Sequence, residues 1–302
     1  MRAIAMSDTE NGKTPGLSAD EEQEVSHNQP PRAAVLHEII RYQGDQELER
    51  TIAALWWSAL AAGLSMGLSM MAMGLFYARL PEGDSSQVIA SLGYSAGFLA
   101  VILARQQLFT ENTLTAVLPV MTDPTLNNLG RLLRLWTVVL FGNLAGTILV
   151  SYVMLYLPIF DSKTDAAFLD IGHKVMENNL QQMFAKGIIS GWMIATMVWM
   201  IPSMEHAKIW IILMITYLMA LGDFTHIVVG SVEVSYLAWA GEVSWPAFWL
   251  DFAAPTLVGN IIGGSFIFAL ISHAQVRSDS GKPPSQLPAL DKDKKPRQHP
   301  QR

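Results

Sequence analysis

The sequence FGNLAG at residues 141–146 recurs in altered form as VGNIIGG at residues 258–264. Each phrase lies inside an apolar segment. Each also follows, by thirty-odd residues, a polar interruption of another apolar segment: LFT at 108–110 before the first phrase, and DFTH at 223–226 before the second. A hydrophobic unit that occurs twice in a sequence, with an interrupted apolar segment in each copy, is typical of a membrane permeation protein built from two repeats.

The composition indicates a membrane protein with polar tails. Hydrophobic residues make up 51% of the 302 residues and charged residues only 15%, whereas a soluble domain carries about 25% charged residues. The charges gather near the two ends and in short connections. The net charge is −6, and no basic patch suits nucleic acid. The chain has no cysteine, which excludes disulfides, thiol catalysis and cysteine metal sites.

Three regions follow from this distribution. Residues 1–34 are predicted to be a disordered cytoplasmic tail, because they are polar and acidic with few apolar groups. The same polarity argues against a cleavable signal peptide. Residues 35–275 are predicted to form a six-helix transmembrane channel domain, which opens with a short amphipathic helix over 35–50. Residues 276–302 are predicted to be a disordered, basic cytoplasmic tail.

Six long apolar segments lie in the central region. A spanning helix needs about 20 apolar residues, which fits single crossings for segments one, three, four and six. Segments two and five are longer and carry polar residues in mid-run, so each is predicted to be two half-helices around an irregular loop. Such a loop survives in a membrane only where it lines a cavity or is buried in protein. The six segments run roughly over 52–78, 87–121, 132–157, 183–202, 209–240 and 247–273.

The distribution of basic residues predicts the orientation. Lys and Arg prefer cytoplasmic connections. The connection between segments two and three carries Arg131 and Arg134, and the C-terminal tail is rich in Lys and Arg, whereas 158–178 holds more acids than bases. Both termini are therefore predicted to be cytoplasmic. The expected fold is an all-α membrane protein with six transmembrane helices in two inverted three-helix repeats, in which helices 2 and 5 are broken.

Ionisable residues at membrane depth are rare and usually face a cavity or a partner. His226 is the one His well inside an apolar segment. It could donate to a solute or exchange a proton near neutral pH, or it could be a neutral, hydrogen-bonded His of the bundle. Thr110 is expected to take the matching place in the first break, as a hydroxyl that meets the solute, as a helix cap, or as both. The ionisable candidates are Arg105, Glu111, Lys186, Asp223, His226 and Glu233.

Charged side chains beside the two breaks are expected to hold the loops. Arg105 and Glu111 bracket the first break, and a mutual or backbone pairing is the expectation, because a lone charge there is costly. Asp223 precedes His226 by three residues. It could orient the imidazole or cap the following half-helix, and the sequence does not separate these two roles.

Uncharged side chains near the breaks are also candidates. Asn143 and Asn260, from the two opening phrases, are expected to be structural amides that tie the loops in place rather than ligands of a solute. Tyr94 and Phe98 lie four residues apart before the first break, and Phe109 lies within it. These rings could form a constriction that blocks hydrated ions, or they could make ordinary lipid and helix contacts.

These residues together resemble the formate/nitrite transporter family. The resemblance covers roughly residues 35–275 and rests on the two Gly-Asn phrases, on 108–110 and on the break at 222–226. It implies an aquaporin-like protomer that assembles as a homo-oligomer, a pentamer with one pore per subunit. It also implies passage of small monovalent anions such as formate or nitrite, and a place in the lipid bilayer of the bacterial inner membrane. No cofactor and no metal are implied.

The resemblance also implies roles for particular residues. His226 is similar to the central pore histidine of the family, and Thr110 is similar to its loop threonine. Tyr94, Phe98 and Phe109 fall where the family has its hydrophobic constrictions. The lysine that draws anions into the outer vestibule matches Lys174, in the stretch GHKV at 172–175, if a one-residue gap is allowed.

The chain departs from the formate channels at three places. Gly191 stands where they carry an Asn in the fourth segment, and Gly230 stands where they carry an Asn just after the histidine. Thr225 replaces the usual Glu before His226. These differences leave the substrate open, and two alternatives to an anion channel follow: an aquaporin-like pore for a small neutral solute, or a non-transporting membrane sensor or partner-binding protein. No nucleophile–base or metal constellation predicts an enzyme.

Overall fold

The structure is a computed structural model that describes residue 18 and residues 31–81 and 83–280. The chain divides into two units, residues 1–32 and 33–302, and the helices below belong to the second. The predicted tails, 1–34 and 276–302, lie largely outside the described residues. The last helix, α15 (Leu270–Ser280), continues past residue 275, where the channel domain was predicted to end.

Three of the predicted single helices are long and apolar: α3 (Ile52–Tyr77), α8 (Leu126–Tyr156) and α10 (Leu180–Met200). Polar side chains begin all three. Thr51 and Thr125 each accept a hydrogen bond from the N–H three residues later, and Asn179 forms a reciprocal capping box with Gln182. In the last segment, helical turns follow one another as α13 (Trp245–Ala247), η4 (Phe248–Ala253), α14 (Ala254–Ile261), η5 (Ile262–Ala269) and α15, where η4 and η5 are π-helical.

Both segments that were predicted to be broken contain a stretch without helix. The second segment holds α4 (Asp84–Ala90), η1 (Ser91–Tyr94), α5 (Ser95–Leu103), α6 (Phe109–Asn112) and α7 (Val117–Thr122). The fifth holds α11 (Lys208–Leu221) and α12 (Ile227–Ala240), after the short 3-10 turns η2 (Ile201–Ser203) and η3 (Glu205–Ala207). Among the described residues, five helices are long and apolar enough to cross a membrane, and α12 is a shorter apolar helix. The prediction of an all-α chain is confirmed.

The two breaks have the same backbone geometry. The first half-helix ends at a residue in the left-handed region, Arg105 with φ 52° and Asp223 with φ 50°. The next N–H reaches back to the carbonyl five residues earlier at 3.0 Å, from Gln106 to Val101 and from Phe224 to Met219. This is the helix-ending motif in which glycine is usual. A non-glycine residue there costs roughly 1–2 kcal/mol, so both breaks carry local strain.

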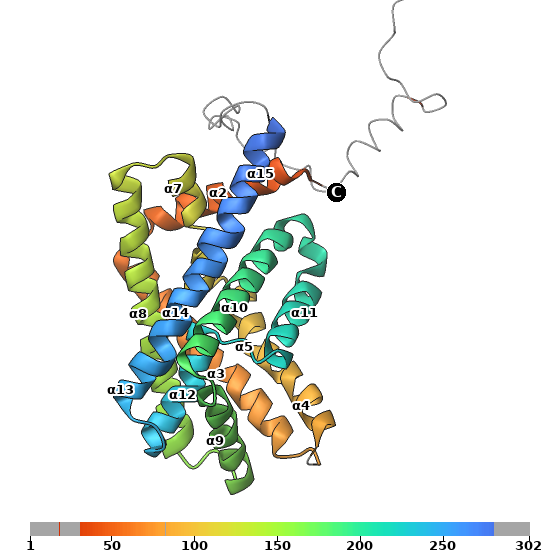
Figure 1. Cartoon of the computed structure of the whole chain (residues 1–302), viewed down its shortest axis with the longest axis vertical. Helices are drawn as coiled ribbons and strands as arrows, with labels where there is room; N and C mark the ends of the chain where they lie inside the picture. Colours follow the sequence, from red (N-terminus) through yellow and green to blue (C-terminus); the bar gives the residue numbers. More distant parts are fainter. Residues whose placement is uncertain (1–17, 19–30, 82, 281–302) are drawn as a thin grey trace, which may run out of the picture. The chain divides into compact units, whose positions relative to one another are not determined.

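Glycines allow two helix pairs to approach closely. A Cβ on Gly63 of α3 would lie 2.2 Å from the Asn143 carbonyl oxygen of α8, and a Cβ on Gly191 of α10 would lie 2.3 Å from the Asn260 carbonyl oxygen of α14. No side chain larger than hydrogen fits at such distances. The repeated phrases of the sequence therefore pack against matching glycines, in the pairs α3–α8 and α10–α14 (Figure 1).

The structure contains one helix that the sequence does not predict. The apolar pattern places a connection over 158–178, but α9 (Ser162–Met176) lies there. Asp161 begins it by accepting hydrogen bonds from the Thr164 N–H at 2.9 Å and from its hydroxyl at 2.6 Å. The helix packs against α3 and α12. It is only partly apolar, so a search for spanning segments passes over it.

The helix predicted over 35–50 is present as α2 (Ala33–Glu49), and it lies with α7 and α15 at one end of the bundle (Figure 1). His37 of α2 and His273 of α15 are both buried, with Nε2 of His37 2.9 Å from Nδ1 of His273. The edge of Trp199 covers His37, at 6.4 Å between ring centroids. A pair of imidazoles thus connects the first and last described helices.

Acidification is expected to loosen α2. Burial first, and the neighbouring His273 second, lower the pKa of His37 from 6.5 to about 4, while Glu38 opposes and Arg41 adds to the shift. Between these two pKa values the unfolded chain binds more protons at His37 than the folded chain, so its contribution to stability falls as the pH falls. The midpoint of thermal unfolding should be at least about 3 °C lower at pH ~4.5 than at pH ~7.5. His37→Gln should reduce this difference, and an equal difference in the variant would contradict the assignment.

Candidate functional site: a cavity that ends at the two breaks

The side chain of Asn143 holds the first break. Its Oδ1 accepts the N–H of Phe109 at 2.9 Å, and its Nδ2 donates to the carbonyl oxygens of Ala59 and Gln107 at 2.8 Å each. These contacts join three parts of the chain: α3, the loop of the break and the start of α6. The amide is fully buried, so its donors and acceptor are satisfied by protein alone.

Asn260 makes the same set of contacts at the second break. Its Oδ1 accepts the N–H of Ile227 at 2.9 Å. Its Nδ2 donates to the carbonyl oxygen of Gly187 at 2.8 Å and lies 3.0 Å from the Ser190 hydroxyl and 3.2 Å from the carbonyl oxygen of Thr225. The Asn thus links α10, the loop and the first turn of α12. Asn143 contacts only backbone groups, whereas Asn260 also contacts the Ser190 hydroxyl, and neither Asn lines the cavity described below.

The matching contacts fix how the two breaks correspond. Phe109 and Ile227 each donate to an Asn, so His226 corresponds to Leu108. Both residues precede a half-helix with extended backbone, φ −102° and −124°. Thr110 is two residues further along and is not the repeat counterpart of His226, which differs from the expectation.

Thr110 and His226 are in contact. Oγ1 of Thr110 lies 2.8 Å from Nε2 of His226, and their exposed fractions are 0% and 1%. Nδ1 of His226 accepts the N–H of Val229 at 3.3 Å, so the imidazole itself caps α12. In a neutral imidazole only one nitrogen carries a proton. That proton is therefore on Nε2, which donates to Thr110, and the Thr110 hydroxyl proton is left to donate elsewhere.

Aromatic rings cover one side of this contact. The ring centroid of Phe98 lies 5.2 Å from that of His226, edge to face, and Tyr94 lies 5.4 Å from Phe98. Phe109 is also buried, but its ring packs on Trp136 of α8 at 5.8 Å. The structure thus brings two of the three predicted constriction residues to the His, and turns the third toward a neighbouring helix.

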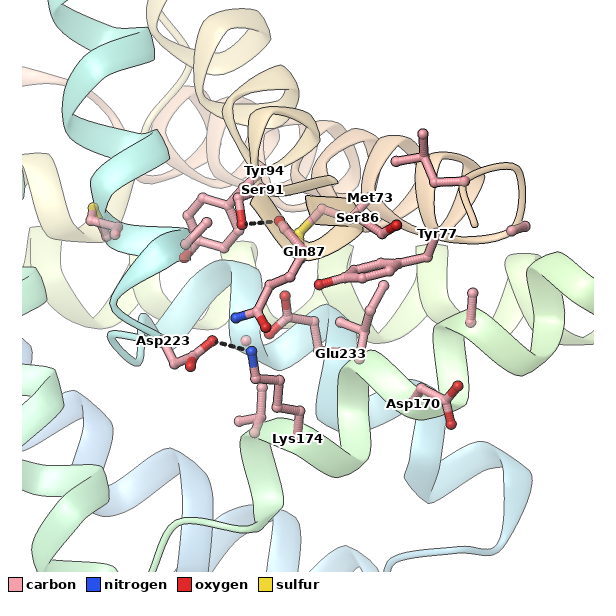
Figure 2. A pocket seen from close by; sticks show the side chains of 18 of the residues that line it. Met73, Tyr77, Ser86, Gln87, Ser91, Tyr94, Asp170, Lys174, Asp223 and Glu233 are labelled. Atoms are coloured by element: carbon pink, nitrogen blue, oxygen red, sulfur yellow. Dashed lines mark hydrogen bonds and ion pairs between the residues drawn. The ribbon is translucent and has the colours of Figure 1, made fainter. Parts of the chain in front are cut away.

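A cavity of about 730 Å³ is lined by His226 and by residues of α4 and α9, among others, and Figure 2 shows part of its lining. Helices α4 and α9 lie at the same end of the bundle (Figure 1). Within the cavity, Nζ of Lys174 lies 2.7 Å from Oδ1 of Asp223, with more than a third of each side chain exposed. Asp223 therefore binds the lysine of α9. It neither orients His226 nor caps α12, which were the two predicted roles, because the αL backbone at Asp223 turns its side chain toward α9.

Acidic groups outnumber basic ones among the residues that line the cavity. The basic side chains are those of Lys163 and Lys174, and the acidic ones are those of Asp170, Asp223 and Glu233. Glu233 of α12 is 5% exposed, and none of the described residues forms a hydrogen bond or ion pair with its carboxyl group. This set of charged side chains does not by itself attract anions into the cavity.

The two charged residues beside the first break, Arg105 and Glu111, do not line the cavity. Within the part of the chain that the structure describes, no hydrogen bond or ion pair joins their side chains, so the expected mutual pairing is not formed. The Glu111 backbone carbonyl does hold the following turn, through the N–H groups of Leu114 and Thr115.

The two glycines that depart from the formate channels are enforced by packing. A Cβ on Gly230 would lie 2.8 Å from the ring of Phe252, and a Cβ on Gly191 would lie 2.3 Å from a backbone oxygen of α14. An Asn side chain cannot enter either place without moving a helix or a ring. The amides are thus absent because the neighbouring elements occupy their space.

Several cavity residues were not foreseen. Tyr77, Gln87 and Phe252 line the cavity, and so does Asp170 of the missed helix α9. Tyr77 is the last residue of α3. A tyrosine at the end of a spanning helix is usually interpreted as an anchor at the membrane interface, so the sequence did not indicate a place in the cavity. For Asp170, the amphipathic pattern over 162–176 was the signal that could have found it.

Comparisons with known proteins agree with this architecture. The family model described as Formate/nitrite transporter matches residues 34–274. The inner membrane protein YfdC of Escherichia coli (strain K12) is 57% identical over 250 residues, which cover 83% of this chain and 81% of that protein. Relatives and family are transport or membrane proteins, which confirms the prediction that the chain is not an enzyme.

Two solved structures have the same fold. A pentameric formate channel with formate bound superposes with a TM-score of 0.64 at 21% identity, covering 74% of this chain and 97% of that one. An ion channel of the FNT family gives a TM-score of 0.62 at 20% identity, covering 80% and 96%. The family model spans almost all of the described helices, and it confirms the resemblance seen in the sequence: the chain belongs to the formate/nitrite transporter family.

Proposed function

We propose that the protein is a channel for a small monovalent weak-acid anion of the formate or nitrite kind. It would lie in the bacterial inner membrane with both termini cytoplasmic, and it would assemble as a homo-oligomer, a pentamer. Support comes from the family, from a relative named as an inner membrane protein, and from a fold shared with a pentameric formate channel. The orientation rests on the basic residues of the short connections.

The proposed architecture is two inverted three-helix repeats with the second and fifth helices broken. The support is the set of paired contacts: Asn143 and Asn260 on the half-helices, αL residues at both breaks, and matching glycines in α3 and α10. Non-helical backbone at membrane depth is tolerated where it is buried in protein or lines a cavity. The first break is held by buried hydrogen bonds, and the second borders the cavity.

The contact between Thr110 and His226 is the observation that carries the proposal. A bare anion that leaves water for a narrow, ring-lined passage loses a large hydration energy. The same solute can cross as the neutral acid, with an oxygen accepting from Nε2–H of His226 or from the Thr110 hydroxyl. A proton joins the anion before this point and leaves it afterwards. The anion of a strong acid gains nothing from such a site.

Lys174 is the proposed entry residue. Its ammonium group is partly exposed in the cavity, where an anion arriving from water would meet it. The ion pair with Asp223 fixes the position of the ammonium group and leaves part of its hydrogen-bonding capacity open to a solute.

A pore for a small neutral solute is the second candidate. The carboxyl groups of Asp170 and Asp223 in the cavity favour it, because ionised carboxylates repel anions. The lack of amides at Gly191 and Gly230 also removes two donors that an anion could use. This candidate predicts solute flux that does not depend on pH.

Replacing His226 by Phe tests the proposed role of the histidine. The ring has a similar size but no N–H, so formate entry into proteoliposomes, followed by an internal pH dye, should fall by at least about tenfold. His206→Phe, at an exposed position, is the control and should conduct like the unchanged protein.

Equal formate entry with His226→Phe and with the unchanged protein would remove the histidine from the pathway. The variant must first elute as the same oligomer as the unchanged protein. Because His226 also caps α12, His226→Asn is the second variant. It keeps a cap and a donor, and it should conduct better than the Phe variant.

A further inference from the structure

Glu233 is the buried ionisable side chain of the cavity that the proposed pathway leaves without a role. It lies on the second turn of α12, one turn after Gly230, and only 5% of it is exposed. A Cβ on Gly230 would lie 3.7 Å from its Oε2, so the carboxyl group lies beside Gly230, which also lines the cavity. Figure 2 shows Glu233 pointing into the cavity that holds the Lys174–Asp223 pair.

The groups around Glu233 give it no counter-charge of its own. The charged side chains that act on it are Asp223 of the second break and Lys174 of α9, and these two already pair at 2.7 Å. From the α3 and η1 side it faces two phenols, Tyr77 and Tyr94. A buried carboxylate without a cation or a hydrogen bond is costly. A proton on the carboxyl group, or a cationic solute, removes that cost.

The histidine is poorly placed to supply a proton. Its Nδ1 accepts the Val229 N–H, and its Nε2–H already contacts Thr110. An additional proton would have to go on Nδ1, and the cap of α12 would be lost. His226 in this geometry is a hydrogen-bond donor. The proton that turns an anion into its acid must therefore come from another group that the solute passes.

We propose that Glu233 is the proton donor of the vestibule. The protonated carboxyl group meets the anion beside Lys174, its Oε–H bond breaks, and a new O–H bond forms on the solute. The neutral acid then moves on to His226 and Thr110. Glu233 remains as a carboxylate and takes a proton back from a hydronium ion of the external solution, which becomes water, so charge and atoms balance. This inference rests on the proposed function, because it assigns the source of the proton for that transport.

Tyr94 supports the same site. Its hydroxyl group is buried and has no hydrogen-bond partner among the described residues, yet the side chain lines the cavity between Glu233 and the ring of Phe98. A free phenol donor at this place can bind an oxygen of the newly formed acid. The site thus offers an acid proton, one neutral donor and one ammonium group to a small oxyacid.

The test compares Glu233→Gln with Glu233→Asp and Glu177→Gln in proteoliposomes. Gln has the same shape but no acidic proton, Asp restores one, and Glu177 is an exposed glutamate just after α9 that does not line the cavity. The probe is sodium formate with an internal pH dye, measured over a range of external pH. For Glu233→Gln we expect initial formate-driven acidification to fall by about tenfold or more. What remains should follow the concentration of free formic acid in the medium.

Glu233→Asp should regain most of the rate with a shifted pH profile, and Glu177→Gln should match the unchanged protein. A pH profile of Glu233→Gln that equals that of Glu177→Gln would overturn the donor role while leaving the channel function intact. No formate-driven acidification by the unchanged protein would overturn the proposed function itself. Should the Gln variant not assemble, an unshifted profile of Glu233→Asp would likewise count against the proposal.

Discussion

Asn260→Leu is expected to keep the protein from accumulating as a folded oligomer. The fully buried amide accepts from Ile227 N–H at 2.9 Å and donates to the Gly187 carbonyl oxygen at 2.8 Å. Leu removes these bonds and leaves buried groups without partners. One orphaned donor costs about 1–3 kcal/mol, and backbone groups in a membrane cost several kcal/mol each. We expect a loss of roughly 3 kcal/mol or more in the free energy of unfolding.

The measurement is the thermal midpoint and oligomer yield of purified protein. Asn128→Leu is the matched control, because the Asn128 amide bonds to Asp123 at the surface, and it should change the midpoint little. Asn260→Asp keeps the acceptor for Ile227 and loses the donors, so it should lie between the two. An Asn260→Leu protein as stable as the control would show that the amide does not hold the second break.

Gly191→Ala is expected to separate α10 from α14. The new Cβ would lie 2.3 Å from the Asn260 carbonyl oxygen and 2.7 Å from its Cα, both backbone atoms that cannot move without the helix. Overpacking of this kind costs about 1–3 kcal/mol and occasionally more. The shift would also pull the Asn260 amide away from the loop it holds, so formate flux should fall together with stability.

Gly130→Ala is the control for Gly191→Ala. Gly130 lies in α8 with nothing within 4 Å of a Cβ built there, and alanine in a helix is favoured over glycine by about 1 kcal/mol. It should leave the thermal midpoint unchanged or raise it. If Gly191→Ala is as stable as Gly130→Ala, the close α10–α14 contact does not exist as described.

The long helices could be predicted because a membrane-spanning helix needs a long run of apolar residues, which the sequence shows directly. The segments predicted over 52–78 and 183–202 differ from α3 and α10 by no more than a few residues at either end. Helix α9 was missed because its stability comes from packing against α3 and α12 and not from apolar composition. Because α9 was not predicted, Asp170 was not among the predicted site residues, and Lys174 was not assigned to a helix.

The partners of the site residues could not be predicted. Lys174 and Asp223 are far apart in sequence, and only the packing of α9 against α12 brings them to 2.7 Å. The sequence locates Thr110 and His226 in the two breaks. It does not predict the hydrogen bond from the Val229 N–H to Nδ1 of His226, which fixes the tautomer of the imidazole. The Gly-Asn motifs of the sequence predicted tie points for the two loops, but the backbone groups that each amide contacts could be found only in the folded structure.

Passage of the neutral acid is tested most directly by formate entry into proteoliposomes of the unchanged protein, at one pH above and one below neutrality, with an internal pH dye. Chloride, the anion of a strong acid, is the comparison. Formate is expected to acidify the interior, faster at the lower external pH, and chloride is not expected to enter at a comparable rate. Equal entry of both anions, or formate entry without acidification, would contradict a passage of the neutral acid past His226 and Thr110.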